Sequence, residues 1–317
     1  MEVFEDIVET IGNTPLVRLS RLHPPGNLVA KLEFMNPGGS IKERIAASMI
    51  DRAEQDGLLK PGGTIVEPTS GNTGVGLALV AAVRGYRVIC TVPDKVSKEK
   101  QDLLRAYGVE VIVTPTEYGP DHPDSYYAVA RRLAGEIEGA FHPDQYRNLA
   151  NPAAHYETTG PEIWRQTKGQ VDVLVAGVGT GGSISGTGRY LKEQKPDVEI
   201  VGADPTGSIY TAGPNDEIHQ YLVEGVGEDF YPDTVDLDLI DRFIRFDDSA
   251  SFAMTRRLAR EEGLLTGGSG GLAVAAALQV ADERENRLVV VLIPDSGRGY
   301  LSKIFNDDWM DEQGFKK

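Results

Sequence analysis

The chain has 317 residues, which is enough for two domains or for one large α/β unit. Acidic residues outnumber basic ones by 48 to 32, so the net charge of −16 disfavours nucleic acid and anionic membranes as partners. The single cysteine, Cys90, excludes an internal disulfide and a cysteine-rich metal site, which favours a reducing, cytoplasmic location. Neither a signal peptide nor a membrane-spanning apolar run is expected from the sequence.

Short β-branched segments alternate with longer amphipathic segments, a pattern typical of βαβ units and parallel sheets. The first group, after a helix that starts behind Ser40, predicts strands at 64–67, 87–92 and 109–114 and helices at 72–83 and 97–107. The second predicts strands at 171–176, 198–203 and 287–293 and helices at 152–166, 182–194, 249–262 and 269–282. Residues 118–124 and 204–238 are expected to be long loops. We therefore expect an α/β fold with two sheets.

The helix expected after Ser40 carries Lys42 in its first turn. Ser40 and Glu43 form a capping-box pattern, and one face of the helix is apolar, with Ile41, Ile45, Met49 and Ala53. The positive end of the helix dipole disfavours an ammonium group, which favours a neutral, nucleophilic amine on Lys42. The alternative is a solvated surface lysine.

A polar segment, Thr69-Ser70-Gly71-Asn72-Thr73-Gly74, lies between an expected strand and an expected helix. It supplies backbone amides, hydroxyls and a side-chain amide at a helix N-terminus, which suits a carboxylate or a phosphate. The alternative interpretation is an ordinary turn with polar caps.

A glycine-rich segment, 177–183, also leads from a strand into a helix. It matches the dinucleotide fingerprint G-x-G-x-x-G, and Asp204 ends the next expected strand at a suitable distance for a ribose. The same loop could instead hold one phosphate of a smaller cofactor through its backbone amides. The spacing alone leaves both interpretations open.

Two further patterns argue against other chemistries. Residues 267–271 match the G-x-S-x-G pattern of hydrolases, but no histidine follows the serine, so we interpret them as a close-approach loop with Ser269 as a cap. The histidines show no metal-ligand spacing and are expected to be surface or packing residues, so no metal is expected; they are His23, His122, His142, His155 and His219.

Four motifs, at 12–16, 36–44, 67–74 and 179–182, together resemble those of the fold-type II pyridoxal-phosphate enzymes, and the resemblance extends over essentially the whole chain. More narrowly, the chain is similar to the cysteine synthase/cystathionine β-synthase family. The motifs at 144–148, 202–208, 224–230 and 294–298 are most similar to the catalytic cores of the bacterial cystathionine β-synthases in that family.

The resemblance implies a tryptophan synthase β-like fold, in which two open twisted α/β sheets hold the cofactor between them. Residues 1–42 and 147–317 would then form a large cofactor-binding domain. Residues 43–146 would form a small mobile domain that carries the loop for the substrate carboxylate and closes on binding.

The resemblance also implies the site. Lys42 would be the catalytic residue and would join pyridoxal 5'-phosphate as a Schiff base. Cofactor binding would fall to Asn72 at the ring oxygen, to Ser296 at the pyridine nitrogen and to Gly179, Thr180, Gly181, Gly182 and Ser183 at the phosphate. Because Ser296 is neutral, it would not favour a pyridinium, which suits elimination more than transamination. Substrate binding would fall to Thr69, Ser70, Gly71, Thr73, Gln145, Tyr146 and Gly225.

The activity implied is that of a lyase in transsulfuration and cysteine biosynthesis. It would condense L-serine with L-homocysteine to L-cystathionine and water through an aminoacrylate. A cysteine synthase that uses O-acetylserine, an activated serine, and sulfide stays open, as does an NAD-binding oxidoreductase outside this class. The resemblance implies a homodimer. No haem is expected, because the haem-binding N-terminal extension of some relatives is missing, and a cytoplasmic location is expected.

Overall fold

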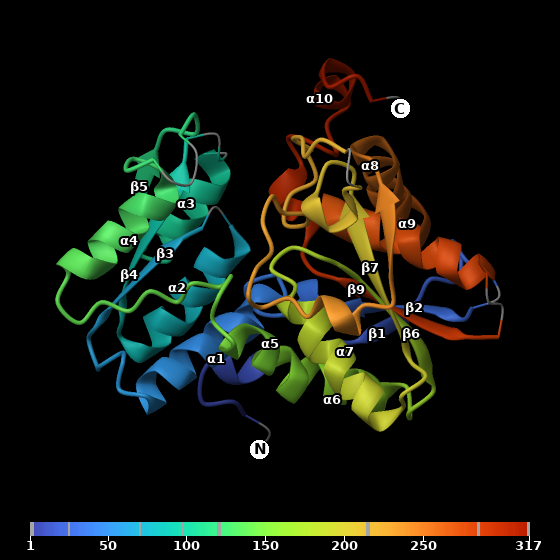
Figure 1. Ribbon diagram of the computed structural model, residues 1–317, viewed down its shortest axis with the longest axis horizontal. Helices are drawn as coiled ribbons and strands as arrows, with labels where there is room; N and C mark the ends of the chain where they lie inside the picture. Colours follow the sequence, from blue (N-terminus) through green and yellow to red (C-terminus); the bar gives the residue numbers. More distant parts are fainter. Residues whose placement is uncertain are drawn as a thin grey trace. The chain divides into compact units, whose positions relative to one another are not determined.

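The computed structural model describes residues 3–24, 26–69, 71–94, 96, 98–118, 122–213, 216–283 and 286–315. These residues form two separate sheets with surrounding helices, which confirms the α/β fold class (Figure 1). The chain divides into a first unit, Met1–Ile11 with Asn36–Asn151, and a second unit, Gly12–Met35 with Pro152–Lys317. The domain boundaries expected from the sequence, after residues 42 and 146, remain a prediction.

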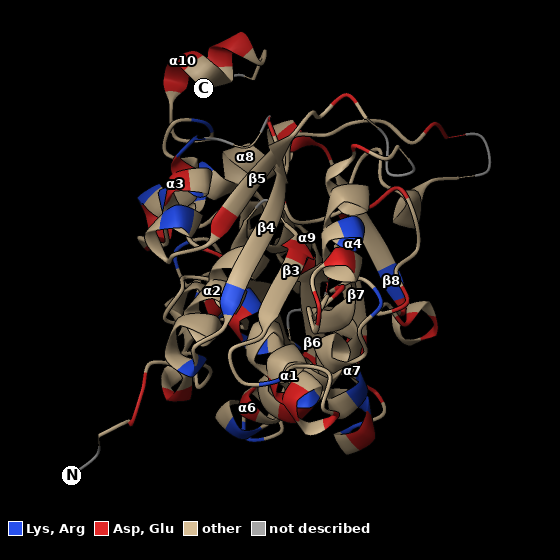
Figure 2. Ribbon diagram, turned by 90° about the vertical axis from the view of Figure 1, so that its left-hand side faces the viewer, with Lys and Arg blue, Asp and Glu red and all other residues tan. Residues whose placement is uncertain are grey.

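The first unit is built on a three-stranded parallel sheet of order β3-β4-β5. Its strands are β3 (Thr64–Pro68), β4 (Arg87–Pro93) and β5 (Glu110–Thr114). Its helices are α1 (Lys42–Gln55), α2 (Asn72–Arg84), α3 (Lys98–Ala106) and α4 (Tyr126–Glu136). The three strands lie side by side and carry little charge compared with the surrounding helices (Figure 2). Because β3 is buried along its whole length, its last residues are held rigidly.

The second unit is built on a six-stranded sheet of order β1-β2-β9-β6-β7-β8. Its strands are β1 (Leu16–Arg18), β2 (Leu28–Leu32), β6 (Val171–Gly177), β7 (Glu199–Pro205), β8 (Arg242–Phe246) and β9 (Leu288–Ile293). Only β1 runs antiparallel to its neighbour, so the carboxyl ends of the other five strands meet at one edge. That edge is where parallel α/β sheets bind their ligands.

Helices cover this larger sheet. They are α5 (Ala150–Ala154), which contains the boundary between the units, α6 (Gly160–Gln166), α7 (Gly182–Gln194), α8 (Asp248–Arg257), α9 (Gly268–Glu283) and α10 (Asp307–Glu312). The core is apolar, and α9 contributes buried residues from Leu272 to Ala281 that pack with the buried valines of β6 and β9. Burial of these apolar side chains is the main favourable contribution to the free energy of folding.

Two helices expected as continuous contain a π-helical turn, at His155–Thr159 and at Leu258–Glu262. The first connects α5 to α6, and the second follows α8 directly. A π turn inserts one extra residue per turn and is frequent at functional sites. The turn at His155–Thr159 proves to lie beside the glycine-rich loop.

The expected strands and helices are confirmed, with ends shifted by at most two residues. α4 and three strands, β1, β2 and β8, were not expected from the sequence. The expected loop 204–238 starts after β7 ends at Pro205 and contains two short 3-10 turns, Ile209–Thr211 and Leu237–Leu239. In the expected loop 118–124, residues 119–121 lie outside the described residues. No helix within the described ranges is long and apolar enough to cross a membrane.

Candidate active site

The start of α1 holds Lys42 in a fixed backbone position. Ser40 Oγ accepts a hydrogen bond from the Lys42 amide at 3.1 Å, while the Glu43 carboxylate accepts from the Ser40 amide at 3.2 Å. The glutamate half of the capping box is therefore formed, but the serine hydroxyl caps Lys42 rather than Glu43. Lys42 is half-buried, and the four apolar residues expected on one face of the helix are buried.

The polar segment between β3 and α2 is anchored to the sheet. The Thr69 amide donates to the Thr91 carbonyl at 3.1 Å, and Thr69 Oγ1 accepts from the Gly71 amide at 3.3 Å. Asn72 is the first residue of α2 and its side chain is exposed, so it is accessible to a ligand. Ser70, expected to bind substrate, lies outside the described residues.

Gln145, expected to bind substrate, lies next to this segment. Thr73 Oγ1 donates to Gln145 Oε1 at 2.7 Å, and both side chains are buried. Tyr146 follows in the chain and is half-buried, with its ring 6.5 Å from that of Tyr127. The structure thus brings Thr73, Gln145 and Tyr146 into one region of the first unit.

The glycine-rich loop of the second unit leads from β6 into α7. Gly181 is the N-cap of α7, with φ +77°, and a Cβ there would lie 2.3 Å from Val235 Cβ, so only glycine fits. The Gly179 carbonyl accepts from Tyr210 OH at 2.6 Å and the Thr180 carbonyl accepts from Thr234 Oγ1 at 2.6 Å. Because a peptide's carbonyl and amide point in opposite directions, the amides that follow these carbonyls point away from Tyr210 and Thr234.

Ser183 contributes a hydroxyl at the same helix start. Its Oγ lies 3.0 Å from Nε2 of His155, whose Nδ1 lies 2.9 Å from Thr159 Oγ1. His155 is fully buried, so its ring is fixed in place and orients the Ser183 hydroxyl. The sequence predicts His155 only as a surface or packing residue and gives no sign of its contact with Ser183.

These donors fit a phosphate group. Residues 177–183 contain no lysine or arginine, and the start of the 13-residue helix α7 has no side chain that caps its amides. Backbone amides and hydroxyls at a helix N-terminus stabilise a dianion through hydrogen bonds and the helix dipole. The donor set therefore fits the cofactor phosphate without a cationic side chain.

Ser296 lies just after β9, at the same sheet edge as the glycine-rich loop. Its Oγ accepts from the Arg298 amide at 3.3 Å, and it pairs with Thr266 in an antiparallel bridge. The hydroxyl proton is not used in the bond to Arg298, so it is available to an acceptor such as a pyridine nitrogen. Ser296 fits the ring end of the cofactor in this respect.

Gly225 packs directly against the glycine-rich loop. A Cβ on Gly179 would lie 2.8 Å from the Gly225 carbonyl oxygen, and Gly227 donates its amide to the Val178 carbonyl at 2.7 Å. Gly225, expected to bind substrate, therefore lies beside the expected phosphate donors.

Asp204 does not suit the ribose role of a dinucleotide fold. It is fully buried, and its Oδ2 accepts from Thr211 Oγ1 at 2.7 Å. Burial raises its pKa to about 6, against the hydrogen bonds of Thr211 and Ser208 and the charge of Arg245, which lower it. The Asp204 carboxyl is therefore buried beneath the loop after β7, where it accepts from Thr211.

The glycines of the hydrolase-like pattern permit close approach, as expected. A Cβ on Gly270 would lie 2.1 Å from Thr266 Oγ1, and one on Gly271 would lie 2.1 Å from Thr255 Oγ1.

Among the residues that the structure describes, no group of three or more His, Cys, Asp or Glu side chains could hold a metal ion.

The two sheets, the lysine at a helix start and the neutral phosphate loop define a class of cofactor-dependent α/β enzymes. The chain belongs to the pyridoxal-phosphate dependent enzymes, whose family model matches residues 7–295. This membership confirms the expected family and its cofactor, pyridoxal phosphate, and disfavours the dinucleotide alternative.

Three relatives illustrate the similarity, each named cystathionine beta-synthase. The protein from Rattus norvegicus is 50% identical, over 100% of this chain and 58% of its own length. The protein from Apis mellifera is 48% identical, over 99% of this chain and 64% of its own length. The protein from Saccharomyces cerevisiae is 46% identical, over 96% of this chain and 64% of its own length. The chain thus spans 58–64% of the length of these curated relatives.

Proposed function

We propose that the chain condenses L-serine with L-homocysteine to give L-cystathionine and water by β-replacement. The observation that carries the proposal is 46–50% identity, over at least 96% of this chain, to proteins named cystathionine beta-synthase. The local structure at Lys42 and at the phosphate loop is compatible with it.

Lys42 is proposed to hold the cofactor covalently, and Gly179, Thr180, Gly181, Gly182 and Ser183 to hold its phosphate. When bound, pyridoxal phosphate supplies an electron sink for the bond changes at the serine Cα and Cβ. Asn72 Nδ2 would donate to the ring oxygen, and the Ser296 hydroxyl would donate to the ring nitrogen. A neutral Ser296 leaves that nitrogen less positive than a carboxylate would, which favours loss of the β-hydroxyl over transamination.

Lys42 also has a proposed role as the proton carrier. With serine bound, the neutral Nζ of Lys42 would take the proton from the serine Cα and would then donate a proton to the departing hydroxyl, which would leave as water. The start of α1 disfavours an ammonium group, which supports Nζ as the base.

The substrate carboxylate is proposed to bind at the segment before α2. The residues assigned to it are Thr69, Ser70, Gly71 and Thr73, with Gln145 and Tyr146 beside them. Gly225, which packs against the phosphate loop, is also proposed to bind substrate. Lys42, Asn72 and these carboxylate-binding residues belong to the first unit, and the phosphate loop, Gly225 and Ser296 belong to the second.

The competing function within the family is cysteine synthase, which uses O-acetylserine and sulfide. Turnover with serine and homocysteine should be compared with turnover of O-acetylserine and sulfide, with the thioether product identified by mass. We expect cystathionine from the first pair and none from a Lys42→Ala variant. Reaction of the second pair alone would overturn the proposal in favour of cysteine synthase.

We also propose that the protein is a homodimer in the cytoplasm. The basis is the family resemblance, together with the buried free Cys90, which needs no oxidising compartment. Sedimentation should give twice the chain mass of 34.4 kDa, and a species of 34.4 kDa alone would contradict the dimer.

A further inference from the structure

A buried carboxylate lies behind the segment proposed to bind the substrate carboxylate. Glu67, near the end of β3, is only 1% exposed. Its Oε2 accepts from the Asp144 amide at 3.0 Å, and its Oε1 accepts from the Gln145 amide at 3.2 Å. Two consecutive backbone amides therefore converge on one carboxylate, an arrangement typical of a backbone anion site.

The backbone that supplies these amides has an uncommon conformation. Asp144 has φ +49°, in the left-handed region that residues other than glycine adopt rarely, aspartate more often than most. Such a conformation persists only where surrounding contacts hold it, and it occurs often at functional sites. The hydrogen bonds to Glu67 help to hold it here. The Arg147 and Asn148 amides, which donate to the Asp144 carbonyl at 3.0 and 2.9 Å, contribute as well.

The hydrogen bonds to Glu67 fix the backbone that carries the Gln145 side chain. Its Oε1 accepts from Thr73 Oγ1 at 2.7 Å, and its backbone carbonyl accepts from Asn151 Nδ2 at 2.8 Å. With Oε1 occupied by Thr73, the group that Gln145 can offer to a ligand is its Nε2, which has two donors. Two donors on a fixed amide are suited to a carboxylate.

We propose that Glu67 is a positioning residue that sets the Gln145 amide against Thr73 and so determines the affinity for the carboxylate of the amino-acid substrate. This inference rests on the proposed function, because it takes serine as the first substrate. Glu67 acts through the 142–145 backbone and makes no contact with the substrate itself.

His142 reports on this carboxylate. Its Nδ1 lies 3.2 Å from Glu67 Oε2 and 2.9 Å from the Val66 carbonyl oxygen. Burial lowers the pKa of His142, but the hydrogen bond and charge of Glu67, with the Val66 carbonyl and the charge of Asp144, raise it above its usual value overall. Removal of the Glu67 charge should therefore lower the pKa of His142, which NMR can follow without any turnover.

The test variant is Glu67→Gln, which keeps the size but replaces one acceptor oxygen with a donor that faces a backbone amide. Serine affinity is measured by titrating the absorbance of the cofactor-loaded enzyme without a second substrate. We expect the Kd and KM for serine to rise about tenfold or more, while kcat, the KM for homocysteine and cofactor retention change less than about threefold. The NMR titration of His142 should move to lower pH.

A matched control is Glu110→Gln, at the exposed start of β5, where the carboxylate pairs with Arg87. It should leave serine affinity and the His142 titration unchanged. Asp144→Gly serves as the rescue, because glycine adopts a positive φ without strain. In the Glu67→Gln background it should restore stability in urea unfolding, and part of the serine affinity should return if Glu67 acts through this backbone.

The outcomes separate the two proposals. Wild-type enzyme that shows no response to serine would refute the proposed substrate. Wild-type enzyme that binds serine, with a Glu67→Gln variant that binds it equally well, would refute the positioning role alone. Parallel losses of serine affinity, homocysteine KM and cofactor retention would also refute it, because they would indicate a merely structural role.

Discussion

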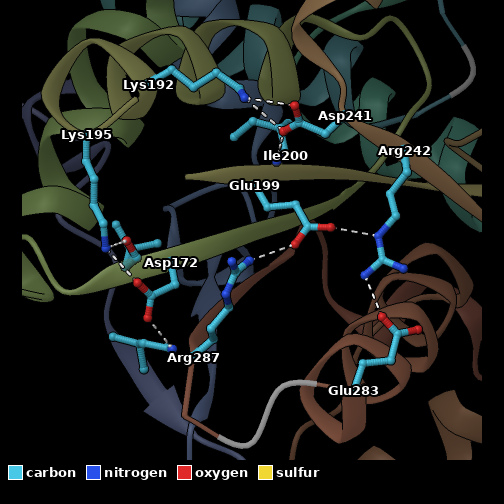
Figure 3. A network of polar contacts seen from close by, with 11 residues as sticks. Asp172, Lys192, Lys195, Glu199, Ile200, Asp241, Arg242, Glu283 and Arg287 are labelled. Atoms are coloured by element: carbon cyan, nitrogen blue, oxygen red, sulfur yellow. Dashed lines mark hydrogen bonds and ion pairs between the residues drawn. The ribbon is translucent and has the colours of Figure 1, made fainter. Parts of the chain in front are cut away.

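The two edges of the six-stranded sheet are stabilised by different kinds of contact. At the amino ends of its parallel strands, side chains form a network of ion pairs (Figure 3). Glu199 pairs with Arg242 at 2.8 Å and with Arg287 at 3.0 Å, while Asp172 pairs with Lys195 at 2.6 Å. At the carboxyl ends, residues 177–183 contain no charged side chain, and the loop is held by backbone and hydroxyl contacts.

We expect substitutions at the ion-paired amino edge to lower the free energy of unfolding less than substitutions at the carboxyl edge. Arg242 is 33% exposed and Glu199 is 19% exposed, so water screens much of their attraction. Exposed ion pairs contribute roughly 0–1 kcal/mol each. Buried polar groups near the carboxyl edge have no access to water once a partner is removed, so each loss costs more. The charge density of a region is thus a poor guide to its importance.

The largest effect is expected at Lys31, which is fully buried near the carboxyl end of β2. Its Nζ lies 2.6 Å from Glu162 Oε2 and donates to the Thr14 carbonyl at 2.6 Å. Lys31→Met leaves Glu162 charged and buried, so the free energy of unfolding should fall by about 3–5 kcal/mol in urea denaturation. The double variant with Glu162→Gln, which removes the charge but can still accept from the Asn13 amide, should recover part of the loss. A loss as small as that at an amino-edge pair would show that the two edges do not differ in this way.

The next effect is expected at Gly181, the N-cap of α7. Gly181→Ala adds a positive-φ strain of ~1–2 kcal/mol and a clash with Val235, so the unfolding free energy should fall by roughly 2–4 kcal/mol. Cofactor retention after dialysis, read from absorbance, should fall as well. In the control Gly263→Ala, at φ +70°, the added Cβ would meet no atom beyond the adjacent residues within 4 Å, so this variant isolates the strain. Equal losses in the two variants would show that the clash is absent.

A smaller effect, of opposite sign, is expected at Asp204. Because folding raises the pKa of this carboxyl to about 6, its stabilising contribution is present below pH ~4 and is lost as the pH rises through about 6. Asp204→Asn should therefore raise the unfolding free energy at pH 7 by about 2 kcal/mol and flatten its pH dependence between ~4 and ~6. Parallel pH profiles for the two proteins in urea denaturation would contradict this.

The smallest effect is expected at the amino edge. Arg242→Ala removes the pairs with Glu199 and Glu283, yet it should lower the unfolding free energy by no more than about 1 kcal/mol. The difference from wild type should shrink further in high salt, because salt screens exposed charges. A salt-independent loss above about 2 kcal/mol would show that this network is more than a screened surface array.

Much of the fold could be predicted from local pattern. The expected helix 182–194 coincides with α7, because glycines mark its start and its buried residues recur with helical spacing. The strands that were missed lack such a pattern. β1 has three residues, β8 reads Arg-Phe-Ile-Arg-Phe at a sheet edge, and β2 contains Lys31, whose burial depends on a partner 131 residues away.

Some residues of the candidate site could likewise be predicted from the sequence, and others could not. Lys42, the Thr69–Thr73 segment and the glycine-rich loop carry sequence motifs, and for this reason they could be proposed from the sequence alone. His155, Tyr210 and Glu67 could not, because each acts on a loop 28 to 78 residues away in the chain. No local spacing encodes those contacts, which arise only when the sheets form.

We propose that Lys42 carries the cofactor and that the neutral loop anchors its phosphate. Borohydride reduction of the cofactor-loaded protein, followed by peptide mass mapping, tests this proposal, because reduction makes the bond between the cofactor and its lysine permanent. We predict one phosphopyridoxyl group per chain, on the peptide that contains Lys42, and none in a Lys42→Ala variant. Modification of a different lysine, or a loaded protein that is not modified at all, would contradict the account.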